Sequence, residues 1–333
     1  MILLAVVADA PRRESGPAAK ANSLVDPNHM STQTPPIPTT PAGGVNTVDA
    51  PVRIECAEIW GGNHTIYAPV ALPGLHGVLY SRPCSGGRGG DLHYLSICGS
   101  GLLSRMCIAD VVGHGETVAK VGSAAYTLVR RSVDRPDQRR MFSALNALLV
   151  ERGLSVLTTA AAFTYYPPTQ RLSYSYAGHP PAWHYERASR TWQRLELDRP
   201  PGLPDDQLVN CPFAISTSTM FTRHRMRLEL GDRFIVVTDG VLEAPDPDGK
   251  LFGADRLTAL LESITGQRPD ADPEAIGAAL VDALNAHRQI ETFDHDDVTF
   301  LVMEVTAAPR GPALWHVLRN RVLRRLTGRG RRA

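Results

Sequence analysis

The alternation of apolar and polar residues along the chain predicts many short strands, separated by a few longer segments with helical periodicity. Alternating positions and short apolar runs bounded by Gly, Pro or Asn are typical of strands. They predict strands at residues 92–98, 102–112, 158–166, 171–177, 182–185, 225–230, 234–237 and 298–305. Apolar residues three and four positions apart predict helices at residues 117–131, 136–152, 257–264 and 273–287.

Two of the predicted strands carry an acidic residue at the same end of a hairpin. The strand at 92–98 begins directly after Asp91, and the strand at 102–112 carries Asp110 near its end. A tight Gly-Ser-Gly turn joins the two strands, so they are expected to pair antiparallel. Because the start of the first strand then lies beside the end of the second, Asp91 and Asp110 are predicted to meet at one end of the sheet.

Composition divides the chain into three parts. Residues 1–51 are rich in Pro, Thr, Ser, Gly and Ala and are expected to form a disordered leader. Residues 52–307 are expected to form the folded domain, in which 60–63, Trp-Gly-Gly-Asn, are typical of a turn. Residues 308–333 form a tail with many arginines and no acidic residue. The tail either binds an anionic surface or is a solvated end, and a charge run favours the solvated end.

The overall composition is that of an ordinary globular protein. The chain has 333 residues, of which 43% are hydrophobic and 21% charged, with a net charge of +1. This near neutrality indicates neither nucleic acid nor a membrane surface as a partner. Residues 1–7 include an apolar run without a preceding basic region, so neither a signal peptide nor a membrane span is expected. Five cysteines without a C-x-x-C pair favour reduced thiols in the cytoplasm over disulfides or a zinc site.

Acidic residues recur at the boundaries of the predicted strands. They are Asp91, Asp110, Asp239 and the pair Asp296 and Asp297. Each alone is typical of a capped turn, but the set suggests a site for hard cations such as Mn²⁺ or Mg²⁺, which prefer carboxylate oxygens. Two such ions can lower the pKa of a bridging water and deliver it to a phosphorus centre. No motif in the chain offers a protein nucleophile instead.

The turn after Asp110 and the residue His179 each allow two interpretations. Asp110 is followed by Gly113, His114 and Gly115, which predict either a helix-capping turn or a tight turn that leaves room for an ion. His179 is either a catalytic base or a residue that structures its turn. Because Gly precedes it and Pro follows it, the turn-structuring interpretation is favoured.

Five ordered motifs resemble those of the bacterial PP2C-like (PPM) serine/threonine phosphatases, in particular the subgroup of the SpoIIE and RsbU phosphatases. The resemblance covers roughly residues 78 to 305. The motifs are Gly89-Gly90-Asp91, Asp110-Val111-Val112-Gly113-His114-Gly115, Ala177-Gly178-His179-Pro180-Pro181, Gly231-Asp232 with Thr238-Asp239-Gly240-Val241-Leu242-Glu243-Ala244, and Asp296-Asp297-Val298-Thr299. Residues 55–75 match none of them and are interpreted as an added strand and loop.

The resemblance implies an α+β fold, an αββα sandwich of two antiparallel sheets flanked by helices, with two Mn²⁺ or Mg²⁺ ions at one end. Asp110 would then bridge both ions, and the main-chain carbonyl of Val111 would bind one of them. Asp239 and Asp296 would hold the other ion, with Asp297 as the alternative if the register is shifted by one. Asp91 would act near the first ion, directly or through water.

The implied reaction is hydrolysis of phosphoserine or phosphothreonine on a protein by the metal-bridging water, without a covalent phosphoenzyme. By analogy the substrate is an anti-sigma-factor antagonist. The main alternative is a catalytically weak scaffold of the same fold that binds regulatory proteins, but it predicts missing acids. A two-metal nuclease would require a basic groove, whereas the basic residues are scattered. The sequence leaves a homodimer open.

The chain departs from the family pattern in two ways. Val112 stands where relatives usually have Ser, which changes polarity near the turn but removes no ligand. No sensory or receiver domain is expected before the phosphatase domain. Regulation is therefore expected from a partner or from the helix at 117–131, with the Gly113 to Gly115 turn as its hinge, if the activity is regulated at all.

Overall fold

The computed structural model describes the greater part of the segment predicted to fold. The described residues are 52–53, 59–84, 88–98, 101–112, 116–132, 137–151, 153, 158–289 and 295–306. The predicted leader at 1–51, the tail at 308–333, and Gly113, His114 and Gly115 of the predicted turn lie outside the described residues.

The strands form two sheets. One has the order β1 (Val52–Arg53), β3 (Ile66–Leu72), β4 (Leu75–Arg82), β13 (Val298–Val305), β12 (Arg233–Val237), β9 (Trp183–Glu186) and β10 (Thr191–Arg194). The other has the order β11 (His224–Arg227), β8 (Arg171–Ala177), β7 (Thr158–Tyr166), β6 (Ser104–Val111), β5 (Arg88–Ile97) and β2 (Ile59–His64). Neighbouring strands pair antiparallel except for β1 with β3.

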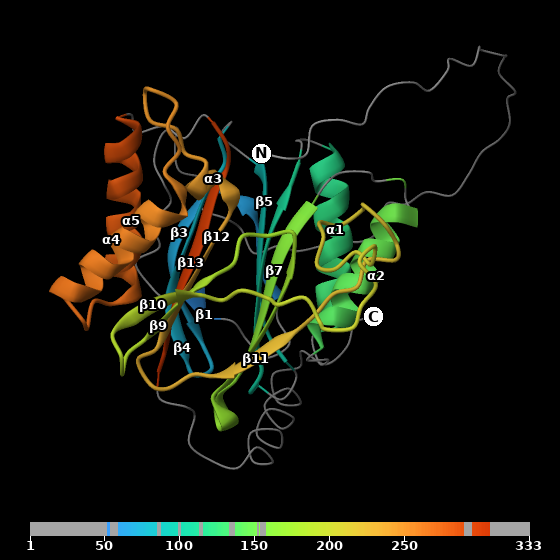
Figure 1. Ribbon diagram of the computed structural model, residues 1–333, viewed down its shortest axis with the longest axis horizontal. Helices are drawn as coiled ribbons and strands as arrows, with labels where there is room; N and C mark the ends of the chain where they lie inside the picture. The colour runs from blue at the N-terminus through green and yellow to red at the C-terminus, as the bar shows by residue number, and fades with distance from the viewer. Residues whose placement is uncertain are drawn as a thin grey trace, which may run out of the picture. The chain divides into compact units, whose positions relative to one another are not determined.

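Helices cover the outer face of each sheet, as Figure 1 shows. The pair α1 (Glu116–Arg131) and α2 (Gln138–Glu151) packs on the six-stranded sheet. The pair α4 (Gly253–Gln267) and α5 (Pro273–Arg288) packs on the seven-stranded sheet. The short α3 (Asp239–Leu242) directly follows β12, and the 3₁₀ turn η1 (Pro167–Thr169) joins β7 to β8. The expected αββα sandwich is therefore confirmed.

The central core lies between the two sheets. Along β6, Met106 and Ile108 belong to this core, whereas Cys107 and Ala109 face the helices, as the two-residue period of a strand requires. Phe163 of β7 is fully buried there, and its ring centroid lies 5.5 Å from that of Phe234 on β12. Aromatic packing of this kind holds the two sheets together across the sandwich.

Most of the predicted elements are confirmed, but the segment at 55–75 differs. The turn predicted at 60–63 is wrong, because these residues belong to β2, with an irregular register between Gly62 and His64. A Cβ at Gly61 would lie 1.9 Å from the carbonyl oxygen of His93, so these glycines permit close strand pairing rather than a turn. The added strand and loop expected at 55–75 are instead two strands, β2 and β3, and the short edge strand β10 was not predicted.

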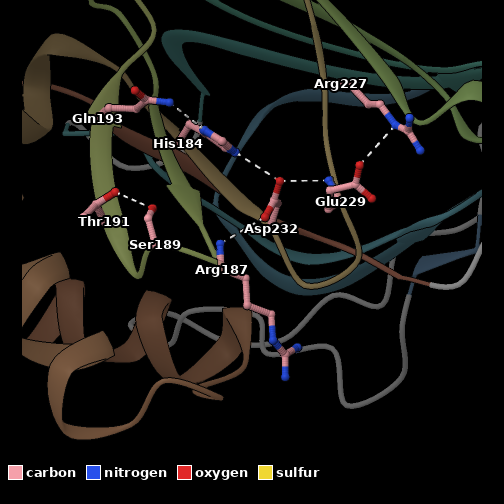
Figure 2. Close-up of polar contacts among 8 residues, drawn as sticks. All are labelled: His184, Arg187, Ser189, Thr191, Gln193, Arg227, Glu229 and Asp232. Atoms are coloured by element: carbon pink, nitrogen blue, oxygen red, sulfur yellow. Dashed lines mark hydrogen bonds and ion pairs between the residues drawn. The ribbon is translucent and has the colours of Figure 1, made fainter.

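A buried polar cluster fixes the corner where β9, β10 and β12 meet, as Figure 2 shows. The Asp232 carboxylate accepts hydrogen bonds from the backbone N–H groups of Arg187 at 3.0 Å and Glu229 at 2.8 Å. His184 Nε2 lies 3.4 Å from the same carboxylate, and Gln193 lies 3.1 Å from His184 Nδ1. Burial acts to raise the pKa of Asp232, but these hydrogen bonds lower it below its usual range. Asp232 comes directly before β12, whereas Asp239 comes after the other end of this strand.

Two negative findings hold for the described residues. No helix among them is long and apolar enough to cross a membrane. Cys84, Cys98, Cys107 and Cys211, the cysteines within the described ranges, are free thiols.

Replacing Phe163 with Ala should lower the free energy of unfolding by about 3–5 kcal/mol, because the substitution leaves a cavity between the sheets. Tyr126→Ala is the control, because that side chain is 40% exposed on α1. Chemical denaturation of both variants measures the difference. An effect of Phe163→Ala no larger than that of the control would contradict the assignment of Phe163 to the central core.

Candidate metal centre

Asp91 and Asp110 lie side by side at one end of the six-stranded sheet. The last paired residues of β5 and β6 at this end are Leu92 and Ala109, and the two aspartates come one residue beyond them. Because Leu92 and Ala109 face the helices, the alternation of the strands turns both aspartates toward the other sheet. The hairpin predicted from the sequence is confirmed, and so is the meeting of its two acids.

The other acids come from the neighbouring strands β12 and β13 of the seven-stranded sheet. Asp239 is the first residue of α3, directly after β12, and Asp296 and Asp297 precede β13. Thr238 Oγ1 donates a 2.9 Å hydrogen bond to Asp91 Oδ2 across the sandwich. The ends of the two sheets therefore meet at the acidic residues that the sequence singled out.

Asp297 holds the ends of the two sheets together with its carboxylate. Its oxygens accept hydrogen bonds from the backbone N–H groups of Cys84 at 2.8 Å, Asp91 at 3.1 Å and Gly90. The residue is only 5% exposed. Three backbone donors satisfy the carboxylate within the protein, which is typical of a structural rather than a metal-binding aspartate.

Two glycines of the motifs are required by the position of Asp297. A Cβ at Gly89 would lie 2.1 Å from Asp297 Oδ2, and a Cβ at Gly240 would lie 1.9 Å from the carbonyl oxygen of Asp297.

Asp296 is more accessible than Asp297. It is partly exposed, and its Oδ1 accepts a 2.8 Å hydrogen bond from the N–H of Asp297. Of this pair, Asp296 is the residue whose carboxylate can turn toward a ligand.

The carboxylates repel one another. Burial, followed by the charges of Asp239 and Asp296, raises the pKa of Asp110 to about 7. Burial and the charge of Asp110 raise the pKa of Asp91 well above its usual range, and burial and Asp296 raise that of Asp239. After burial, the strongest influence on each group is another carboxylate. The site therefore favours a cation that neutralises several acids at once.

The donor chemistry fits hard divalent cations. All the candidate side chains offer carboxylate oxygens, which are the ligands that such cations prefer. Val111, whose carbonyl is a candidate ligand, ends β6 and pairs with Thr158. Within the ranges that the structure describes, no three Asp, Glu, His or Cys side chains already converge in ion-binding geometry.

His179 is buried at the same end of the six-stranded sheet. It follows Gly178, whose φ of +64° is in the left-handed region and whose N–H donates to Asn210. His179 Nδ1 lies 2.9 Å from the carbonyl oxygen of Pro180, and burial lowers the pKa of the ring to about 4. A neutral, buried ring hydrogen-bonded to its own turn favours the turn-structuring interpretation.

Sequence reasoning did not assign a role to Thr238, Thr299 or Glu243, although all three lie within or beside the quoted motifs. The Thr238 hydroxyl donates to Asp91, and the Thr299 hydroxyl donates to Ser81. The charge of Glu243 contributes to the raised pKa of Asp110 and of Asp239. Its spacing of four residues from Asp239, one helical turn, is a signal that could have identified it.

Comparisons with known proteins identify the family. The family model of stage II sporulation protein E (SpoIIE) matches residues 103–306. The RsbU and RsbW domains of a Mycobacterium tuberculosis protein are 22% identical, with a TM-score of 0.54 over 74% of this chain and 64% of that one. A structure of the PP2C phosphatase domain and a regulatory fragment of SpoIIE from Bacillus subtilis is 14% identical, with a TM-score of 0.54 over 73% of this chain and 64% of that one.

A further solved structure similar to this chain was determined with a bound cation. RsbX in complex with magnesium is 16% identical, with a TM-score of 0.50 over 72% of this chain and 100% of that one. Structural similarity at these levels of identity shows a shared fold. The search of curated proteins found no match.

Replacing Asp110 with Asn should stabilise the protein at high pH in the absence of metal. The pKa of Asp110 is about 7 in the folded state and about 3.8 when unperturbed, so its favourable contribution is present below about pH 4 and is lost as the pH rises toward 7. In EDTA at pH 8, Asp110→Asn should therefore exceed the wild type in free energy of unfolding by more than about 1 kcal/mol.

The same comparison at pH 4 should show a much smaller difference, because Asp110 is then protonated in the folded protein. Chemical denaturation at the two pH values measures both. A variant that is less stable than the wild type at pH 8 would show that the Asp110 carboxylate is not strained by its neighbours.

Replacing Gly89 with Ala should destabilise the protein by about 1–3 kcal/mol, because the new methyl group displaces the carboxylate of Asp297 from its backbone donors. The matched control is Gly122→Ala in α1, where the nearest atom would lie at an ordinary 3.5 Å. That substitution should be neutral or stabilising by up to about 1 kcal/mol. Thermal and urea unfolding distinguish the two, and equal effects would argue against a close approach at Gly89.

Proposed function

Because the chain belongs to the SpoIIE family of PP2C-like phosphatases, we propose that it is a metal-dependent protein serine/threonine phosphatase. The observation that carries the proposal is the meeting of Asp91 and Asp110 from one sheet with Asp239 and Asp296 from the other. Their mutual repulsion is the electrostatic condition under which divalent cations bind.

In this proposal two Mn²⁺ or Mg²⁺ ions would be held by the carboxylates of Asp110, Asp239 and Asp296 and by the carbonyl of Val111. Asp110 would serve both ions, Val111 one of them, and Asp239 and Asp296 the other. Asp91 would act near the first ion. When bound, the two ions supply an acidified water as the nucleophile and neutralise charge on the phosphoryl oxygens. Asp297 was the alternative ligand, but its backbone hydrogen bonds support a positioning role instead.

The chain's own residues then serve to orient the centre. The carboxylates at the ends of β5, β6 and β12 are fixed by strands that pack on a common core, so their directions are set before any substrate arrives. The sandwich itself excludes water from one side of the site, because Asp91 is 3% exposed and Thr238 is fully buried. Such preorganised charge is the main requirement of phosphoryl transfer.

The substrate we propose is a phosphorylated regulatory protein, in particular an anti-sigma-factor antagonist. Family membership is the support for this substrate. The cysteine usage supports a cytoplasmic location, where thiols stay reduced. We also retain the alternative of a catalytically weak scaffold that binds regulatory proteins, although every acid of the centre is present in this chain.

The proposal predicts hydrolysis of p-nitrophenyl phosphate and of a phosphoserine peptide by the purified full-length protein only when Mn²⁺ or Mg²⁺ is present. Asp110→Ala should reduce kcat/KM by about 100-fold or more, because even indirect metal contacts are worth about 10–100-fold. Asp248→Ala is the control, since Asp248 is exposed in the turn after α3.

Turnover in EDTA, or full activity of Asp110→Ala, would contradict the metal-dependent mechanism. If no divalent cation supports turnover while a regulatory protein still binds, the scaffold alternative is correct.

A further inference from the structure

A layer of buried hydroxyl groups links Asp91 to the opposite sheet. Thr238 and Thr299 are fully buried, and Ser81 is 1% exposed. They come from β13, the end of β12 and β4, three neighbours in the sheet that faces Asp91. We propose that Thr238 is a positioning residue that orients the Asp91 carboxylate for cation binding. This inference rests on the proposed function, since it concerns the same centre.

The direction of the hydrogen bonds around Thr238 is determined by its neighbours. The N–H of Thr238 donates to the Thr299 carbonyl oxygen at 2.9 Å, and the N–H of Thr299 donates to Thr238 Oγ1 at 3.0 Å. The Thr238 hydroxyl lies 3.2 Å from the Thr299 carbonyl oxygen and 2.9 Å from Asp91 Oδ2. The bond to Asp91 is the shorter one and has the charged acceptor, which makes it the stronger of the two. Successive donors of this kind polarise one another and strengthen the final bond.

Thr299 supports Thr238 from the adjacent strand. Its N–H donates to Thr238 Oγ1 at 3.0 Å, and its hydroxyl donates to Ser81 Oγ at 2.9 Å. The Thr238 hydroxyl, held by these neighbours, fixes the rotation of the Asp91 carboxylate and the face that it presents to Asp110. In a buried site a hydrogen bond to a carboxylate is stronger than one between neutral groups.

The main chain of Asp91 is held from the same sheet. Asp297 accepts hydrogen bonds from the N–H groups of Gly90 and Asp91, so it fixes the backbone at the start of β5. Both the backbone and the side chain of Asp91 are therefore set by residues of the opposite sheet. Residues that orient a ligand without touching the ion typically affect metal affinity strongly.

The test is titration of the metal-free full-length protein with Mn²⁺ by isothermal titration calorimetry. Thr238→Val should weaken Mn²⁺ binding by about 10–100-fold, and Thr238→Ser, which keeps the hydroxyl, should stay within about threefold of the wild type. The matched control is Thr164→Val, which removes a buried hydroxyl bonded to Gln138 on the outer face of β7 and should leave affinity unchanged.

Each outcome separates this inference from the proposed function. Wild-type affinity in Thr238→Val, or equal weakening in Thr164→Val, would overturn the positioning role alone. Absence of Mn²⁺ binding in the wild type would overturn the proposed metal centre and the positioning role with it. Weak binding by Thr238→Val, restored in Thr238→Ser, supports the positioning role even if the protein hydrolyses no phosphopeptide.

Discussion

Repulsion among carboxylates at the junction of the two sheets is the constraint on which the rest of the structure depends. Asp91 and Asp110 come from one sheet, and Asp239 and Asp296 come from the other, so closing the sandwich forces like charges together. The fold offsets this cost with the Phe163 and Phe234 core and with the hydrogen bonds of Asp297. A site that is unfavourable without its cation is typical of a functional centre.

The same constraint explains the glycines and hydroxyl residues of the motifs. Gly89 and Gly240 leave space for Asp297, whose carboxylate joins the start of β5 to the loop before β13. Thr238 supplies a hydroxyl group to Asp91 at a place where burial of an unpaired carboxylate would be costly. The motifs therefore combine candidate ligands with the residues that hold them, and only the ligands carry the proposed chemistry.

Sequence patterns predicted most of the strands and helices, but they failed for the edge strands β2 and β10. The hairpin of β5 and β6 was predictable because its alternation and tight turn are local, and the meeting of Asp91 with Asp110 follows from it. The role of Asp297 was not, because its partner Gly90 lies 207 residues away in the chain. The glycines of β2 suggested a turn because the close approach of His93 has no local signature.

A crystal structure of the full-length protein grown with Mn²⁺ tests the proposed centre most directly. The proposed metal centre predicts that this crystal structure will contain two ions bridged by the Asp110 carboxylate, with Asp239 and Asp296 on one of them. Asp297 should still be bonded to the N–H groups of Cys84 and Asp91. An ion held by Asp297 in place of Asp296, or no ion beside Asp110, would contradict it.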